Sequence, residues 1–189
     1  MTELFIKNMV CNRCIIAVRQ ELLNKGIEPI SIDLGLVRLT NKLDPDLRDS
    51  LAKDLKISGF ELLEDAKSKL VDQIKTFIIN KIHHVEFVEM TSNWSQLISM
   101  ELNHEYKFLS SIFSSFEKTT IEQYIIRQKV ERVKELLLYD ELNLSEISYQ
   151  LGYSSVQHLS QQFKKITGST PSQYKSSTEA NKRNPLDKI

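Results

Sequence analysis

The segment that most constrains this chain is residues 142–174, LNLSEISYQLGYSSVQHLSQQFKKITGSTPSQY, because helix and turn signals follow one another in a fixed order. Ser145 stands where a helix N-cap belongs, and Gly152 supplies the left-handed backbone that ends one helix and redirects the chain. The next helix has apolar residues at spacings of four and three that should face the core, namely Leu159, Phe163 and Ile166. Two helices joined by such a turn predict a helix-turn-helix that reads DNA.

Polar residues occupy the remaining face of this second helix and the turn before it. The candidates for DNA contact in this unit are Ser154, Gln157, His158, Gln161, Lys164 and Lys165. A glutamine amide pairs bidentately with adenine, and a histidine reaches a base edge or a phosphate. The serine and the lysines are expected to position the protein on the DNA backbone. The unit is therefore predicted to read bases through its glutamines.

The same stretch resembles the second helix-turn-helix of the AraC/XylS family of bacterial transcription regulators. The residues that carry the resemblance are Leu144-Ser145-Glu146-Ile147, Leu151-Gly152-Tyr153, Leu159-Ser160, Phe163-Lys164-Lys165, Thr167-Gly168, Thr170-Pro171 and Tyr174. The resemblance implies two recognition helices in successive major grooves of double-stranded DNA. It also leaves room for a homodimer and for a contact with RNA polymerase. Periodicity alone would equally describe a helical hairpin that binds nothing.

Residues 66–176 should then form an all-α DNA-binding domain with two such units. Residues 66–84 have helical spacing, another helix is capped by Ser92 or Asn93, and residues 119–138 read as one long helix. The aromatic residues expected in the core of this domain are Trp94, Phe108 and Phe113.

Residues 105–113 resemble the first recognition helix of the family, with departures. Ser111 stands where the family often has arginine, and the glycine that usually ends this helix is replaced within residues 116–119. The candidate DNA contacts of this first unit are Lys107, Ser110 and Ser111. Because Lys107 is the only basic residue on the helix, the first unit should attract phosphate weakly, and the second unit should dominate affinity.

Residues 1–65 have a different organisation, in which strand-like and helical segments alternate. The expected order is a strand at 3–9, a helix at 12–25, a hairpin of strands at 30–34 and 36–40, a helix at 45–57 and a strand at 60–63. This is the split βαβ order of ferredoxin-like domains. The predicted fold class is therefore α+β, with a βαββαβ ferredoxin-like domain followed by the all-α domain.

The two cysteines of the chain, Cys11 and Cys14, lie three residues apart at the start of the first expected helix. Backbone N–H groups and the dipole at a helix N-terminus favour thiolates, and Arg13 adds a nearby cation. Soft thiolates select Cu(I), or Zn(II) when two further donors are present, and the candidates for these donors are water, a second subunit, or His83 and His84 if the fold brings them close. Reversible disulfide formation and simple packing against the sheet are the alternatives.

Met9-Val10-Cys11-Asn12-Arg13-Cys14 and Ile57-Ser58-Gly59-Phe60 resemble the heavy-metal-associated domain of copper chaperones and metal-transport ATPases. That family has a glycine where this chain has Asn8. The resemblance implies a ferredoxin-like fold and metal binding by Cys11 and Cys14. A cytosolic Cu(I) chaperone, or an adaptor that binds proteins through a degenerate helical domain, is therefore the alternative to a regulator.

Composition narrows the choice of function. The formal net charge is zero, yet basic residues outnumber acidic ones from Val156 onward, where DNA would be bound. Two cysteines cannot build a disulfide framework, and no apolar run is long enough to span a membrane, so a cytoplasmic protein is expected. No nucleophile-and-base spacing or phosphate loop occurs, so no enzyme is predicted. Residues 177–189 are polar and are expected to form a flexible tail.

Overall fold

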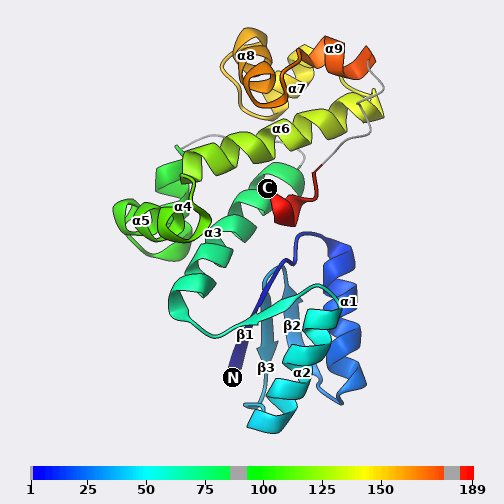
Figure 1. Ribbon diagram of the computed structural model, residues 1–189, viewed down its shortest axis with the longest axis vertical. Helices are drawn as coiled ribbons and strands as arrows, with labels where there is room; N and C mark the ends of the chain where they lie inside the picture. Colours follow the sequence, from blue (N-terminus) through cyan, green and yellow to red (C-terminus); the bar gives the residue numbers. More distant parts are fainter. Residues whose placement is uncertain (1, 86–92, 177–183) are drawn as a thin grey trace. The chain divides into compact units, whose positions relative to one another are not determined.

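The computed structural model describes residues 2–85, 93–176 and 184–189, and the chain divides into two compact units, Met1–Thr76 and Phe77–Ile189 (Figure 1). The division falls inside helix α3 (Ala66–His83), which therefore contributes to both units. Most of the described chain is helical, and one small antiparallel sheet belongs to the first unit. The expected combination of a mixed first part and a helical second part is confirmed at this level.

The first unit contains a sheet of four strands and two helices. In chain order they are β1 (Thr2–Lys7), α1 (Asn12–Asn24), β2 (Pro29–Asp33), β3 (Leu36–Leu39), α2 (Pro45–Ile57) and β4 (Glu61–Leu63). The strands lie in the order β2-β3-β1-β4, and every neighbouring pair is antiparallel. The predicted sequence of elements is present, and the last strand begins one residue later than expected.

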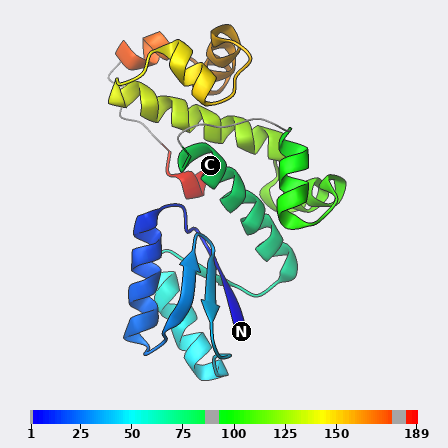
Figure 2. The ribbon, with the colours of Figure 1, turned by 180° about the vertical axis from the view of Figure 1, so that it is seen from behind.

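Alternation along β1 builds the core of this unit. Leu4 and Ile6 are buried between more exposed neighbours, so one face of the sheet is apolar. Helices α1 and α2 cover that face and contribute buried residues at helical spacing, which are Val18, Leu22, Leu51 and Leu55 (Figures 1 and 2). At the start of α2 the Asp44 carboxylate accepts a hydrogen bond from Leu47 N at 2.9 Å, and Pro45 opens the first turn.

The second unit is helical. After α3 its elements are α4 (Trp94–Leu102), α5 (Tyr106–Glu117), α6 (Ile121–Tyr139), α7 (Leu144–Gln150), α8 (Val156–Thr167), α9 (Pro171–Ser176) and a short 3₁₀ turn, η2 (Leu186–Lys188). Helices α4 and α5 gather at the N-terminal end of α6, while α7, α8 and α9 lie along its other half (Figures 1 and 2). The long helix α6 is thus shared by both pairs.

Three local expectations for this unit were wrong. The N-cap of α7 is Asn143 and not Ser145, because the Asn143 side chain can accept from two backbone N–H groups while Glu146 reaches back. Phe108 is 49% exposed and does not belong to the core. Ile166 is 39% exposed, because it lies at the edge of the stripe that Leu159 and Phe163 bury. Phe113 is fully buried, as expected.

Polar residues buried on α6 connect three segments of the second unit. Gln128 Nε2 donates to the Leu186 carbonyl at 3.2 Å, and this carbonyl can only accept, which fixes the amide orientation. Gln128 Oε1 therefore accepts a hydrogen bond, at 2.9 Å, from Nε2 of His83, the last residue of α3. Asn184 donates twice to Glu131, from its backbone N at 3.2 Å and its side chain at 3.1 Å.

These contacts bear on the expected tail. Residues 184–189 lie against α6 through the hydrogen bonds of Asn184 and Leu186, although polar composition suggested a flexible end. The rest of that segment, residues 177–183, lies outside the described residues. Glu131 is itself buried and forms an ion pair with Lys134 at 2.6 Å, so the chain end completes a buried polar group.

Candidate nucleic-acid interface and thiol pair

The α4–α5 pair and the α7–α8 pair repeat the same arrangement, with equivalent residues numbered 50 apart (93 and 143, 113 and 163). Asn93 caps α4 by accepting from Gln96 N at 2.9 Å, and Asn143 caps α7 by accepting from Ser145 N and Glu146 N. The second cap is stronger, because Glu146 also accepts from Asn143 N at 2.7 Å and completes a capping box.

Each recognition helix is fixed by a buried aromatic pair. Phe113 of α5 meets Tyr124 edge-on at 5.5 Å between ring centroids, and Phe163 of α8 meets Tyr174 in the same way at 5.4 Å. All four rings are buried, so these pairs hold α5 and α8 against the helices that come next in the chain. The two units therefore share one scaffold.

The equivalent ends of α5 and α8 explain a departure seen in the sequence. Gly168 ends α8 with φ 83°, and Lys118 ends α5 with φ 54°. Both residues adopt left-handed backbone and donate from their N–H to the carbonyl four residues earlier. The missing glycine thus does not change how the first recognition helix ends, although lysine adopts this conformation less readily than glycine.

The predicted DNA contacts of the second unit lie on one accessible side of α8 and the turn before it. Ser154, Gln157, His158, Gln161, Lys164 and Lys165 are all at least partly exposed. Ser155 caps the helix by accepting from His158 N at 3.1 Å. The His158 ring is held by Ser154 Oγ, 3.0 Å from its Nδ1, and by an edge-on contact with Tyr153. The hydrogen bond to Ser154 uses Nδ1, so Nε2 is the ring nitrogen that could face DNA.

In the first helix-turn-helix unit the predicted contacts occupy the equivalent positions, but their side chains are less able to read bases. Lys107 and Ser111 are exposed and Ser110 is partly exposed. Lys107 is equivalent to Gln157 and Ser111 to Gln161, so neither glutamine has a counterpart that pairs bidentately with adenine. The N-terminal turn of α5 is tied instead to α6, because the Tyr106 hydroxyl donates to Glu122. Burial, together with this bond and the carboxylate charge, raises the pKa of Tyr106.

A buried lysine that was not predicted from the sequence supports the second helix-turn-helix unit. Lys129 of α6 is 8% exposed, and its ammonium lies 5.0 Å from the centre of the Tyr153 ring. Burial lowers the pKa of Lys129 from its ordinary 10.5 to about 8. Because Tyr153 also contacts His158, the lysine lies behind the turn that presents α8. Its position in a repeating helical pattern gave no signal of this burial.

The thiol pair lies at the N-terminus of α1, in the N-terminal compact unit that contains the sheet. Cys11 Sγ and Cys14 Sγ are 3.5 Å apart, and Cys14 Sγ is 3.8 Å from the Asn8 carbonyl. Burial raises the pKa of Cys14, and the neighbouring thiol adds to this. Burial acts on Cys11 too, but hydrogen bonds from Cys14 and the Arg13 backbone, with the Arg13 charge, lower its pKa overall. The two sulfurs are therefore unequal.

Asn8 explains how the loop forms without the glycine that its resemblance would supply. Its φ of 72° lies in the left-handed region, which asparagine adopts more readily than most residues. The Asn8 side chain also donates to the Gly59 carbonyl at 3.0 Å, which ties the cysteine loop to the end of α2. The replacement keeps the backbone conformation and adds a hydrogen bond.

The donor set around the thiols limits what they could hold. No group of three or more histidine, cysteine or carboxylate side chains gathers among residues 2–85, 93–176 and 184–189. His83 is buried and uses Nε2 on Gln128, so it is committed to α6. Two sulfurs alone suit Cu(I), whereas a closed Zn(II) site needs four ligands.

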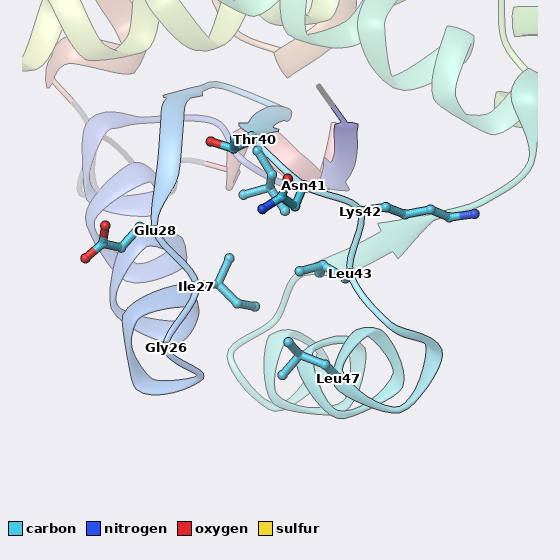
Figure 3. Close-up of a pocket in the computed structure, with 9 residues that line it drawn as sticks. Gly26, Ile27, Glu28, Thr40, Asn41, Lys42, Leu43 and Leu47 are labelled. Atoms are coloured by element: carbon cyan, nitrogen blue, oxygen red, sulfur yellow. The ribbon is translucent and has the colours of Figure 1, made fainter.

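A cleft of about 410 Å³ lies in the first unit, between the end of α1 and the loop that leads into α2 (Figure 3). The side chains of Ile27, Leu43 and Leu47 point toward one another in it, whereas Glu28 and Lys42 point away. The cleft thus offers a small apolar floor without an inward charge.

No helix in the described part of the chain is long and apolar enough to cross a membrane.

Comparison with known proteins agrees with this geometry. Residues 99–177 match the family model of a helix-turn-helix domain, so the repeated helical pairs define a protein that carries such a domain. The Msm operon regulatory protein of Streptococcus mutans is 26% identical over 132 residues, which are 70% of this chain and 45% of that protein. YtdP of Bacillus subtilis, an uncharacterised HTH-type transcriptional regulator, is 22% identical in an alignment of 201 positions that covers 87% of this chain and 25% of that protein.

Among solved structures, the C-terminal domain of AraT, a response regulator from Geobacillus stearothermophilus, has 25% identity and a TM-score of 0.49, and the match covers 59% of this chain and 87% of that one. The chain spans about half or less of the length of the two regulators named above. Both names describe regulators.

Proposed function

We propose that this chain is a sequence-specific DNA-binding regulator of transcription. The observation that carries the proposal is the repeated pair of helix-turn-helix units, each with a recognition helix whose polar side is exposed, in a segment that matches a helix-turn-helix family model. Two such helices on one scaffold suit two successive segments of a DNA major groove. Double-stranded DNA is therefore the proposed partner.

The second helix-turn-helix unit would supply most of the affinity for DNA and would make most of the contacts that read bases. Gln157 and Gln161 are one helical turn apart on the exposed side of α8, and each amide can pair bidentately with adenine. Lys164 and Lys165 follow on the same helix and would hold phosphates. The resemblance further suggests a contact with RNA polymerase and a homodimer, and both stay predictions.

The proposal is tested by selecting bound fragments from random or genomic DNA with the whole chain. A shared motif is expected, and Gln157→Ala with Gln161→Ala should lose affinity for it by tenfold or more while keeping weak non-specific binding. Gln123→Ala is the matched control, since Gln123 is an exposed helical glutamine of α6 outside both recognition helices. Failure to enrich any motif, or equal losses in both variants, would contradict the proposal.

The N-terminal compact unit, which contains the sheet, is proposed as a heavy-metal-associated-like domain with ferredoxin-like topology that receives a signal. Its strand order and its thiol pair support this assignment. Cys11 and Cys14 would hold Cu(I) or form a disulfide with each other, and Zn(II) would require donors from outside the described residues. Either event would change the charge and geometry of the loop that Asn8 ties to Gly59.

This second part is tested by measuring affinity for the selected motif with reduced, Cu(I)-loaded and oxidised protein. A severalfold difference among the three states, lost in the variant with both Cys11→Ser and Cys14→Ser, is expected. Identical affinity in all states would restrict the thiols to another role. A chain that binds Cu(I) but enriches no DNA motif would favour a chaperone instead.

A further inference from the structure

The exposed aromatic residue at the start of α5 has no role in the core. Phe108 is 49% exposed, while Leu109, Ile112 and Phe113 bury the inner side of the helix. It is the third residue of α5 and so lies in the first turn of the recognition helix. In helix-turn-helix proteins the N-terminal residues of this helix contact base edges.

The repeat shows which position Phe108 occupies. Its equivalent in the second unit is His158, the third residue of α8. Each side chain is held by the residue four positions earlier: His104 packs on Phe108 with 5.5 Å between ring centroids, and Ser154 bonds His158 at 3.0 Å. The two units therefore present a supported side chain at the same point, one apolar and the other polar.

A phenyl ring cannot donate or accept an ordinary hydrogen bond, so it cannot read the polar edges of bases. The 5-methyl group of thymine is the apolar feature that the major groove presents, and phenylalanine is among the side chains that contact it. Lys107, next to Phe108, is exposed and can hold a phosphate beside it.

We propose that Phe108 is a specificity-determining residue that contacts a thymine methyl in the half-site of the first helix-turn-helix unit. This inference rests on the proposed function, because it requires that α5 enter DNA. The first helix-turn-helix unit would then make a hydrophobic contact with DNA in place of the glutamine and arginine contacts that this unit lacks. The half-site read by α5 should then contain one or two invariant thymines.

The test replaces each thymine of the selected motif, one at a time, by deoxyuridine, which lacks only the methyl group. Wild-type protein should lose about fourfold in affinity at one or two positions, the factor expected for one buried methyl group. Phe108→Ala should bind the thymine motif more weakly by at least that factor and be insensitive to deoxyuridine at those positions. Phe108→Leu should retain part of the sensitivity, because its side chain still contacts a methyl group.

Phe116→Ala is the matched control. Phe116 is 46% exposed on the same helix, but it lies near the C-terminal end of α5, away from the first turn. This variant should respond to deoxyuridine as the wild type does. A motif whose binding is unaffected by deoxyuridine at every position, or a Phe108→Ala variant that keeps the wild-type pattern, would overturn the inference. Absence of any DNA motif would instead refute the proposed function, and this inference with it.

Discussion

Lys129 lies on α6 behind the second helix-turn-helix unit, and its burial has a calculable effect on stability. Its side chain is almost fully buried, and no carboxylate lies within ion-pair distance of its ammonium in the described part of the chain. The Tyr153 ring offsets only part of the loss of hydration. The pKa of Lys129 therefore falls to about 8, from an ordinary value of 10.5.

Proton linkage gives the sign and size of the effect. Between about pH 8 and pH 10.5 the unfolded chain binds more protons at this site than the folded chain, so stability rises with pH across that window. Below about pH 8 both states are protonated, and the folded state carries the full cost of burying the charge. A shift of this size corresponds to about 3 kcal/mol.

Lys129→Met should therefore stabilise the second unit at pH 7 by about 1–3 kcal/mol, since methionine fills similar space without a charge. Urea denaturation at pH 7, 8, 9 and 10 would measure this, with Lys165→Met, a substitution at an exposed lysine, as the control. The difference between wild type and Lys129→Met should shrink as the pH rises. A variant that is less stable at pH 7, or a difference independent of pH, would refute the reasoning.

Two further perturbations test other contacts. Asn8→Ala should lower stability by about 1–2 kcal/mol, because it loses the bond to Gly59 and strains a backbone at φ 72°, whereas Asn8→Gly should cost less; thermal unfolding compares the two. Removal of residues 184–189 should lower the urea midpoint by an amount equivalent to about 1–3 kcal/mol, since buried Gln128 and Glu131 lose partners, and an unchanged midpoint would contradict the docking of this segment.

The sequence predicted the order of the elements well, because strand alternation, helical spacing and turn residues are local signals. The cap of α7 was misplaced by two residues, since Asn143 and Ser145 can both cap and only the position of Glu146 decides between them. The replaced glycine at the end of α5 suggested an altered first unit. The backbone of Lys118 is nevertheless left-handed, because the packing of Phe113 on Tyr124 fixes the path of the chain from α5 into α6.

Phe108 shows why exposure could not be predicted from periodicity. Apolar residues at 108, 109, 112, 113 and 116 form a stripe wider than the face that the domain buries, and tertiary contacts decide which edge stays outside. The same ambiguity affected Ile166, which is equivalent to Phe116 in the repeat. Burial of Lys129 was equally hidden, because lysine in a helix is usually exposed.

The fixed offset of 50 residues separates the positions that build the two units from the positions that distinguish them. The positions that agree are caps and buried rings, such as Asn93 with Asn143 and Phe113 with Phe163. Several positions that differ are exposed on the recognition helices, such as Phe108 against His158. Because the differing residues make few contacts within the domain, changing them should alter the preferred DNA with little effect on folding. An exchange of Phe108→His should therefore leave the free energy of unfolding within about 0.5 kcal/mol and abolish the preference for a thymine methyl.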